Sequence, residues 1–248
     1  MSESPEEIHN IVRQHYAQHA ITSSSCCADS NCCDNTFYNP ELLLDLPADV
    51  SGFSLGCGDP VTLAGLAPGS TVLDLGSGGG LDCFLAAKQV GPSGHVIGVD
   101  MTPEMLERAR AAAEKMGIPN VEFRYGFLEE LPVDDNHVDV ILSNCVINLA
   151  PDKAPVFAEA FRVLKPGGLF SVSDIIIRGE LSAELKKDME AWSACVSGAM
   201  PEQEYIEKLA AAGFTDIQVQ ATGEFTEALP FVPSGVPFSA LIKAHKPL

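Results

Sequence analysis

The sequence predicts an α/β fold with a doubly wound, mostly parallel sheet, and three observations lead to this prediction. From residue 71 onward, short apolar stretches typical of buried strands alternate with segments of helical pattern. The first such strand, residues 71–75, runs directly into a glycine-rich turn at 76–80. The segment 165–168, which reads Lys-Pro-Gly-Gly, ends a helix just before another strand.

The elements follow from these patterns in chain order. A helix is expected over 4–20, where Ser4 can cap it and Glu6 and Glu7 lie near its positive end, and a short one over 40–46. Strands are expected at 71–75, 95–99, 121–125, 138–142 and 169–174, with helices at 81–90, 103–116 and 152–164. Helices at 181–196 and 202–212 and strands at 214–221 and 238–245 follow.

Length, net charge and cysteine content limit the classes of protein to which this chain can belong. The 248 residues suit one domain with additions, and the net charge of −19 argues against nucleic acid or an anionic membrane as a partner. Apolar runs stay below the ~18 residues of a membrane span, and the N-terminus lacks the pattern of a signal peptide. We therefore expect a cytoplasmic protein, and a monomer because nothing suggests an obligate dimer. Eight cysteines in a reducing compartment favour soft-metal or redox chemistry over structural disulfides.

The glycine turn indicates the kind of ligand. It nearly matches the dinucleotide fingerprint that begins at Gly76, but Leu81 stands where the last glycine belongs. Asp74 lies two residues before the turn, and a pyrophosphate disfavours a carboxylate beside it. A ligand with an amine and a sulfonium tolerates that carboxylate, so we predict S-adenosylmethionine. The alternative is a tight strand–helix turn that binds nothing.

Acids after the next strands support this prediction. Asp100 follows the second strand, 20 residues after Gly80, where an acid can bind ribose hydroxyls. Met101 could pack on an adenine, and Glu129 could accept a hydrogen bond from its amino group. Taken singly, these residues could equally cap a turn, fill the core or face solvent. The residues that we assign to the cofactor site are Asp74, Gly76, Ser77, Gly78, Asp82, Asp100, Met101, Leu128, Glu129 and Asn144.

The chain from Thr71 to Asp174 therefore resembles the core of the class I S-adenosylmethionine-dependent methyltransferases. The resemblance rests on the glycine turn, on the acid after the second strand, and on residues 164–168 before the fifth strand. It implies a Rossmann-like fold and the cofactor, but it leaves the substrate open. We divide the chain into an N-terminal cysteine-rich extension at 1–65, a cofactor-binding core at 66–176 and a C-terminal cap segment at 177–248.

Three cysteines outside the N-terminal cluster lie in distinctive segments, 55–60 around Cys57, 143–149 around Cys145 and 192–199 around Cys195. These segments are similar to the three cysteine-bearing segments of the arsenite methyltransferases, and the resemblance covers residues 38–245. It implies that these three thiolates bind trivalent arsenic, a soft ion that prefers sulfur. Cys83, among apolar neighbours in the helix at 81–90, is instead expected to be a core residue.

The resemblance also implies redox chemistry. Methyl transfer oxidises arsenic, and a cysteine pair, thioredoxin or glutathione would return it to the trivalent state. Cys57 with an N-terminal cysteine is the pair that we expect. The chain departs from the simplest family pattern in its doubled pairs, Cys26-Cys27 and Cys32-Cys33, so Cys32 is only a weaker candidate for the upstream role.

Two other functions stay open at this point. A methyltransferase for a small organic acceptor would need a base near Asn144 or in the C-terminal segment, and its turnover would survive loss of the cysteines. A non-catalytic thiol protein could sequester a soft metal with the four N-terminal cysteines. The glycine turn, Asp74 and Asp100 argue against sequestration alone, because a metal sink has no use for an adenosine pocket.

Overall fold

The structure is a computed structural model, which describes residues 4–22, 38–44, 46–51, 56–180, 192, 195–224 and 235–248. Its strands are β1 (Thr71–Leu75), β2 (His95–Asp100), β3 (Val121–Tyr125), β4 (Val138–Asn144), β5 (Leu164–Gly179), β6 (Thr215–Glu224) and β7 (Gly235–His245). Its helices are α1 (Pro5–Thr22), α2 (Pro40–Leu43), α3 (Ala48–Ser51), α4 (Pro60–Ala64), α5 (Leu81–Val90), α6 (Pro103–Met116), α7 (Lys153–Val163) and α9 (Glu202–Ala212), with a 3₁₀ turn, η2, at Ile147–Leu149.

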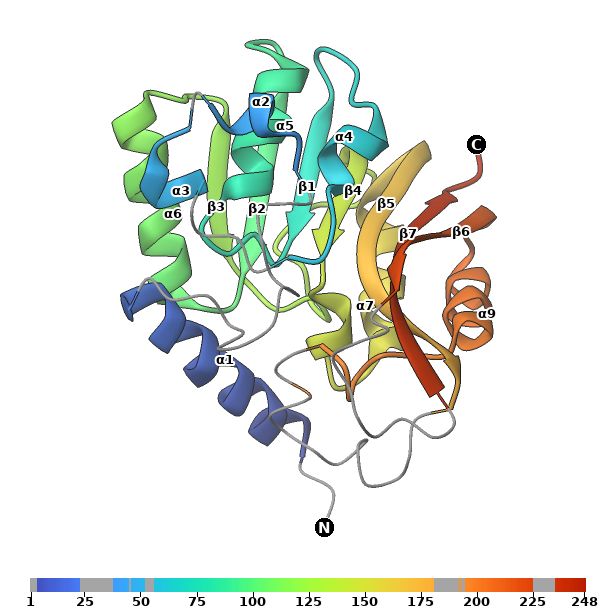
Figure 1. Cartoon of the computed structure of the whole chain (residues 1–248). Helices are drawn as coiled ribbons and strands as arrows, with labels where there is room; N and C mark the ends of the chain where they lie inside the picture. The colour runs from blue at the N-terminus through green and yellow to red at the C-terminus, as the bar shows by residue number, and fades with distance from the viewer. Residues whose placement is uncertain are drawn as a thin grey trace.

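The strands form one sheet in the order β3-β2-β1-β4-β5-β7-β6, as Figure 1 shows. Neighbours from β3 to β5 pair in parallel, and β7 runs antiparallel between β5 and β6. The predicted doubly wound, mostly parallel sheet is thereby confirmed. The carboxyl ends of β1, β2 and β4 lie at one edge, and ligands bind at such an edge in open α/β sheets.

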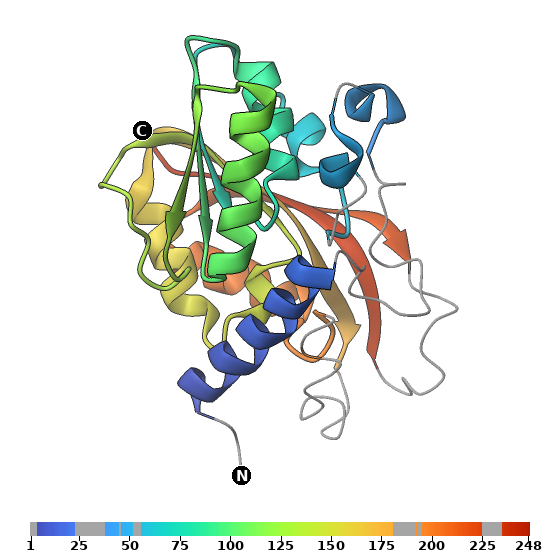
Figure 2. The ribbon, with the colours of Figure 1, turned by 90° about the vertical axis from the view of Figure 1, so that its left-hand side faces the viewer.

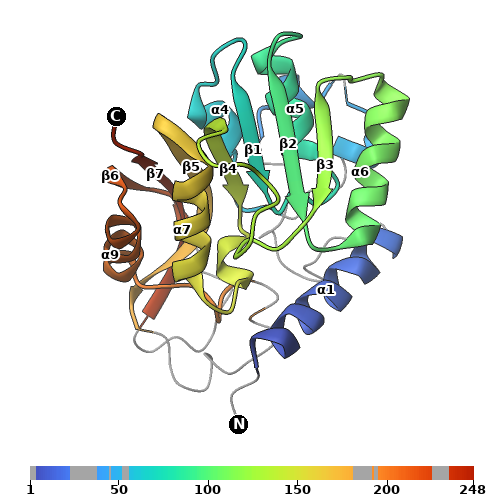
Figure 3. The ribbon, with the colours of Figure 1, turned by 180° about the vertical axis from the view of Figure 1, so that it is seen from behind.

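Helices cover both faces of the sheet and bury a separate apolar cluster on each. One cluster joins the sheet to α4, α5 and α6, with Val61, Phe84 and Leu106 in its interior. The other joins it to α7 and α9, with Phe157 and Tyr205 among its largest side chains. Figure 3, seen from behind, shows α7 in front of the sheet, with α5 on its far side. This packing buries the central strands on both faces.

Local signals account for where these helices begin and end. Thr102 precedes α6, Pro103 occupies its first turn, and Gly117 ends it in the left-handed conformation. The side chain of Asp152 accepts a hydrogen bond from the backbone N–H of Ala154 at the start of α7. Such caps satisfy backbone groups that the helices themselves cannot pair.

The structure departs from the sequence prediction mainly at β5. We expected a strand at 169–174, after the helix stop at 165–168. The strand instead continues to Gly179, since Ile175, Ile176 and Ile177 pair with 237–239 of β7. The predicted helix at 181–196 lies largely outside the described residues. Short helices at α3 and α4 were not predicted.

The first helix, α1, crosses the edge where the central parallel strands end. Figures 1 and 2 both place it there, beside the end of α6. The guanidinium of Arg108 in α6 donates to the carbonyl of Ala20 in α1 at 3.3 Å. Within the parts of the chain that the structure describes, every helix falls short of the length and apolarity that a membrane span requires.

Candidate functional site

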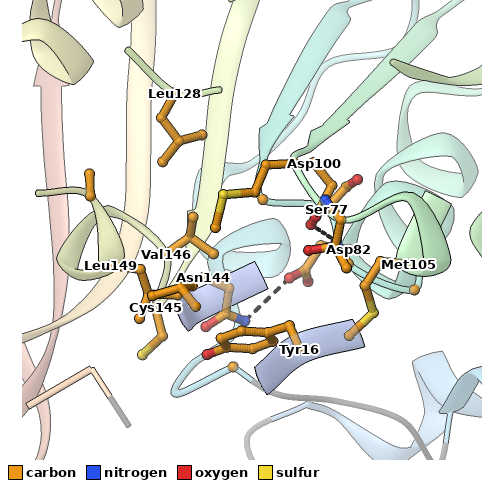
Figure 4. Close-up of a pocket in the computed structure, with 18 of the residues that line it drawn as sticks. Tyr16, Ser77, Asp82, Asp100, Met105, Leu128, Asn144, Cys145, Val146 and Leu149 are labelled. Atoms are coloured by element: carbon orange, nitrogen blue, oxygen red, sulfur yellow. Dashed lines mark hydrogen bonds between the residues drawn. The ribbon is translucent and has the colours of Figure 1, made fainter. Parts of the chain in front are cut away.

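A pocket lies at the carboxyl ends of β1, β2 and β4, beneath α1. Figure 4 shows side chains from several elements facing it, including Tyr16 of α1 and Asn144 of β4. The predicted residues that line it are Gly76, Ser77, Gly78, Asp82, Asp100, Met101, Leu128, Glu129, Asn144 and Cys145. Segments distant in the sequence thus meet in one place, as the positions at strand ends suggested.

The turn after β1 brings the backbone close to this pocket. Gly76 has a φ of 69°, and a Cβ there would lie 2.4 Å from a methyl group of Val146. Only glycine combines that conformation with so close an approach. The hydroxyl of Ser77 is buried and has no hydrogen-bond partner among the described residues. A glycine cradle with a free hydroxyl fits the polar end of an adenosyl amino acid.

Asp100 stands at the end of β2 with its carboxylate fixed by backbone donors. One oxygen accepts from the N–H of Gly78 at 2.9 Å and the other from that of Thr102 at 2.8 Å. Burial raises the pKa of Asp100, and these hydrogen bonds oppose the shift. A carboxylate held in this way can still accept hydrogen bonds from a ribose, because each oxygen has a second lone pair.

Two more buried carboxylates surround the turn. Asp74 is 2% exposed and does not line the pocket; its Oδ2 accepts a hydrogen bond from the thiol of Cys83 at 3.2 Å. Burial and the nearby charge of Asp82 raise the pKa of Asp74. Asp82 does line the pocket, and burial raises its pKa to about 7 despite a hydrogen bond from the hydroxyl of Tyr38. Cys83 is a buried core residue, as predicted.

Asn144 connects the cofactor side of the pocket to the cysteine loop. Its Oδ1 accepts from the backbone N–H of Cys57 at 2.8 Å. Its Nδ2 donates to the carbonyl of Gly58 at 2.8 Å and to Asp82 at 3.2 Å, a contact drawn in Figure 4. One side chain therefore fixes the 56–58 loop relative to the glycine turn.

The three predicted arsenic ligands lie together beside the pocket. Cys57 and Cys145 form a disulfide, with their Cα atoms 5.9 Å apart, and the thiol of Cys195 donates to the carbonyl of Cys145 at 2.7 Å. All three belong to one buried apolar cluster. Cys145 and Cys195 have φ values of 59° and 63°, a conformation that is uncommon for residues other than glycine.

The observed disulfide differs from the pairing that we expected. Cys57 was expected to pair with an N-terminal cysteine, whereas it is bonded here to Cys145. The sequence could not indicate this bond, because 88 residues separate the two cysteines. The N-terminal candidates Cys26, Cys27, Cys32 and Cys33 lie outside the described residues.

Sequence reasoning missed the part of the pocket that α1 provides. His9, Val12 and Tyr16 line the pocket, and their spacing places them on one face of the helix. His9 contacts the carboxylate of Glu129 through Nε2 at 3.0 Å, and its ring lies 5.0 Å from that of Phe127. Val12 is fully buried and packs in the same cluster as the three cysteines. The spacing of these three residues on one helix face was the available signal, although their residue types do not by themselves indicate a binding role.

The sheet order, the glycine turn and the acid at the end of β2 together define a class I methyltransferase. Residues 66–213 match the family model described as "Methyltransferase domain". The arsenite methyltransferase of Halobacterium salinarum is 42% identical over 90% of this chain and 61% of its own length. That of Aquipseudomonas alcaligenes is 41% identical over 84% of this chain and 62% of its own length.

A solved structure agrees with these relatives. The crystal structure of an arsenic (III) S-adenosylmethionine methyltransferase from Chlamydomonas reinhardtii matches with a TM-score of 0.74 and 34% identity, over 84% of this chain and 73% of that one. The chain belongs to the arsenite methyltransferase family. It spans about three fifths of the length of the two curated relatives above.

Proposed function

We propose that the protein methylates trivalent arsenic with S-adenosylmethionine as the methyl donor. The observation that carries this proposal is the position of the cysteines: Cys57, Cys145 and Cys195 gather in one buried cluster, and Cys145 also lines the cofactor pocket. An arsenic atom held at Cys145 would therefore lie next to the donor. The named activities of the relatives support the same assignment.

Arsenic enters this site by exchange of its oxygens for sulfur. Each protein thiol that forms an As–S bond gives its proton to a departing hydroxide, which leaves as water. Thiolates are the soft ligands that suit trivalent arsenic. In the disulfide form the sulfurs of Cys57 and Cys145 are already bonded to each other. Two electrons from a thiol reductant must therefore free them before arsenic binds.

The chain contributes orientation and exclusion of water. When bound, S-adenosylmethionine would supply an electrophilic methyl group: the lone pair of arsenic would form the new bond to carbon while the bond from that carbon to the sulfonium breaks, with its electron pair left on the neutral thioether. No general base is required, because arsenic bound to sulfur carries no proton to remove. Alignment of two reactants can contribute on the order of 7 kcal/mol or more. The apolar side chains of Val12, Leu149 and Ile175 pack around the cysteines and keep water away.

A redox step follows each transfer. Methylation leaves arsenic in the pentavalent state, and two thiolates return it to the trivalent state when they give up two electrons and form a disulfide. The Cys57–Cys145 bond is one product that such a step would leave. We propose that thioredoxin or glutathione then reduces it, consistent with a reducing, cytoplasmic environment. Removal of inorganic arsenite is the physiological role that fits this chemistry.

The decisive experiment incubates the purified protein with arsenite, S-adenosylmethionine and excess thiol, and separates the arsenic species over time. Methylarsenicals should accumulate. Stoichiometric arsenite binding without product would favour sequestration. If the protein forms no methylarsenical and binds no arsenite, the alternative of a methyltransferase for a small organic acceptor would be favoured.

Cys145→Ser tests the assignment of the site. We expect it to abolish methylation while S-adenosylmethionine still binds, because the hydroxyl is a poor ligand for arsenic. The matched control is Cys83→Ser, which removes a buried thiol that contacts Asp74 but keeps a donor there. If Cys145→Ser methylates arsenite at the wild-type rate, the assignment is wrong.

A further inference from the structure

A buried lysine stands near the cysteine cluster and has no part in the chemistry above. Lys153 is 7% exposed and begins α7. A cation at this end of a helix opposes the helix dipole, and its burial is unfavourable. Its Nζ donates to the carbonyls of Ala150 at 2.7 Å and Asn148 at 3.2 Å. The groups that this buried ammonium contacts therefore indicate what it stabilises.

Lys153 and the residues that it contacts are connected to Trp192 and Cys195. Nζ lies 4.9 Å from the centre of the Trp192 ring, and the indole N–H of Trp192 donates to the carbonyl of Leu149 at 3.2 Å. Asn148 donates through Nδ2 to the carbonyl of Cys195 at 3.3 Å. Two hydrogen bonds therefore connect the η2 turn after Cys145 to Trp192 and to the backbone of Cys195.

The fit between these segments is tight. A Cβ on Gly198 would lie 2.0 Å from the carbonyl oxygen of Asn148 and 3.4 Å from Nζ of Lys153. Cys195 itself is held in a left-handed conformation. A non-glycine residue keeps that conformation only where its surroundings impose it. Burial lowers the pKa of Lys153 to about 8, and the charge of the nearby buried Asp174 opposes that shift.

We infer that Lys153 is a positioning residue for arsenic binding, whose ammonium fixes the turn after Cys145 relative to Trp192 and Cys195 at the spacing that arsenic requires. The inference rests on the proposed function and adds a residue to it. Two thiols on separate segments bind one atom well only when their separation is set in advance. Loss of the ammonium should therefore weaken arsenic binding more than cofactor binding, although Ala150, whose carbonyl accepts from Lys153, also lines the pocket.

The test is Lys153→Met, which keeps the length of the side chain and removes the charge. With the full chain and excess thiol, we expect the KM for arsenite to rise about tenfold, as expected for loss of hydrogen bonds from a charged group. The KM for S-adenosylmethionine should stay within about twofold. Lys208→Met on α9, which removes a surface lysine near Glu204, is the control and should change neither value. An unchanged KM for arsenite, or equal rises in both KM values, would overturn the inference.

A second variant, Trp192→Phe, tests the same connection between the η2 turn and Trp192 if Lys153→Met does not fold. Trp192→Phe keeps a ring for the ammonium and loses only the N–H bond to Leu149, so the arsenite KM should rise about threefold. Arsenite binding without cofactor, followed by the near-ultraviolet absorbance of As–S bonds, provides a readout that does not need turnover. A wild type that binds arsenite and yields no methylarsenical would contradict the proposed function alone. Equal binding by the wild type and the variants would contradict the role of Lys153 alone.

Discussion

At the scale of single residues, Gly76 shows how closely the cofactor turn is fitted to its neighbours. Alanine at this position would have both an unfavourable φ and a Cβ 2.4 Å from Val146, the residue after Cys145. We expect Gly76→Ala to raise the dissociation constant for S-adenosylmethionine at least tenfold and to lower the free energy of unfolding by about 2 kcal/mol. Calorimetric titration and urea unfolding measure the two effects.

Gly65 provides the matched control. It has a similar φ of 65°, but a Cβ there would meet no atom within 4 Å. Gly65→Ala should therefore show only the conformational penalty, about 1 kcal/mol, with cofactor affinity unchanged. Equal losses in the two variants would mean that the contact with Val146 has no importance.

Residue types at strand ends predicted much of the lining of the pocket at the carboxyl ends of the strands, and they did so for a physical reason. Asp100 and Asn144 follow apolar strands, and parallel strands deliver their carboxyl ends to one edge. The partner of Cys57 could not be found in this way, because Cys145 is brought to it by sheet pairing and by the loop that Asn144 holds. The buried lysine at 153 gave no signal either, since lysine is usually a surface residue.

At the scale of elements, α1 is the part of the site whose role the sequence did not reveal. Its existence was predicted from Ser4 and the acids of its first turn. Its contacts were not, because Val12 is its one fully buried residue in a helix otherwise rich in polar groups. Val12 is buried because the helix packs over the pocket at the ends of the strands. A single apolar residue in a polar helix does not predict that contact.

Val12→Asp tests whether α1 closes the site. A carboxylate in the buried cluster should displace the helix, because an unpaired buried charge is strongly unfavourable. We expect the KM for S-adenosylmethionine and the KM for arsenite each to rise about tenfold or more, since α1 borders both sites. Steady-state kinetics with each substrate varied in turn would measure this.

The control for that prediction lies on the same helix. Ile21 is 74% exposed, so Ile21→Asp adds the same charge to α1 without entering the cluster. It should leave both KM values unchanged. Wild-type kinetics in Val12→Asp would show that the helix rests on the pocket without contributing to it.

At the scale of the whole molecule, buried acids make folding stability depend on pH. Burial raises the pKa of Asp82 and of Asp174 to about 7, from an ordinary 3.8. The folded protein therefore binds more protons than the unfolded chain between about pH 4 and pH 7, and its stability falls as pH rises through that range. Carboxylates whose pKa is lowered, such as Glu122 and Glu159, act in the opposite direction only below about pH 4.5.

We therefore expect the free energy of unfolding to be higher at pH 5.5 than at pH 7.5, by on the order of 1–2 kcal/mol for each buried acid. Urea unfolding at both values measures it. Asp174→Asn should reduce the difference, because the amide does not titrate, whereas Asp134→Asn on an exposed loop should not. A wild type that is more stable at pH 7.5 would contradict the prediction.

The position of α1 also affects how the methyl donor and its product are exchanged. In the proposed reaction each methyl group requires a fresh donor and leaves a spent one, and both occupy the pocket that α1 helps to line. The redox step that follows each transfer takes the sulfur of Cys145 into the Cys57–Cys145 disulfide, so the arsenical loses that ligand. Each further methylation then needs reduction of the disulfide and a new arsenic-binding event, as well as a new donor.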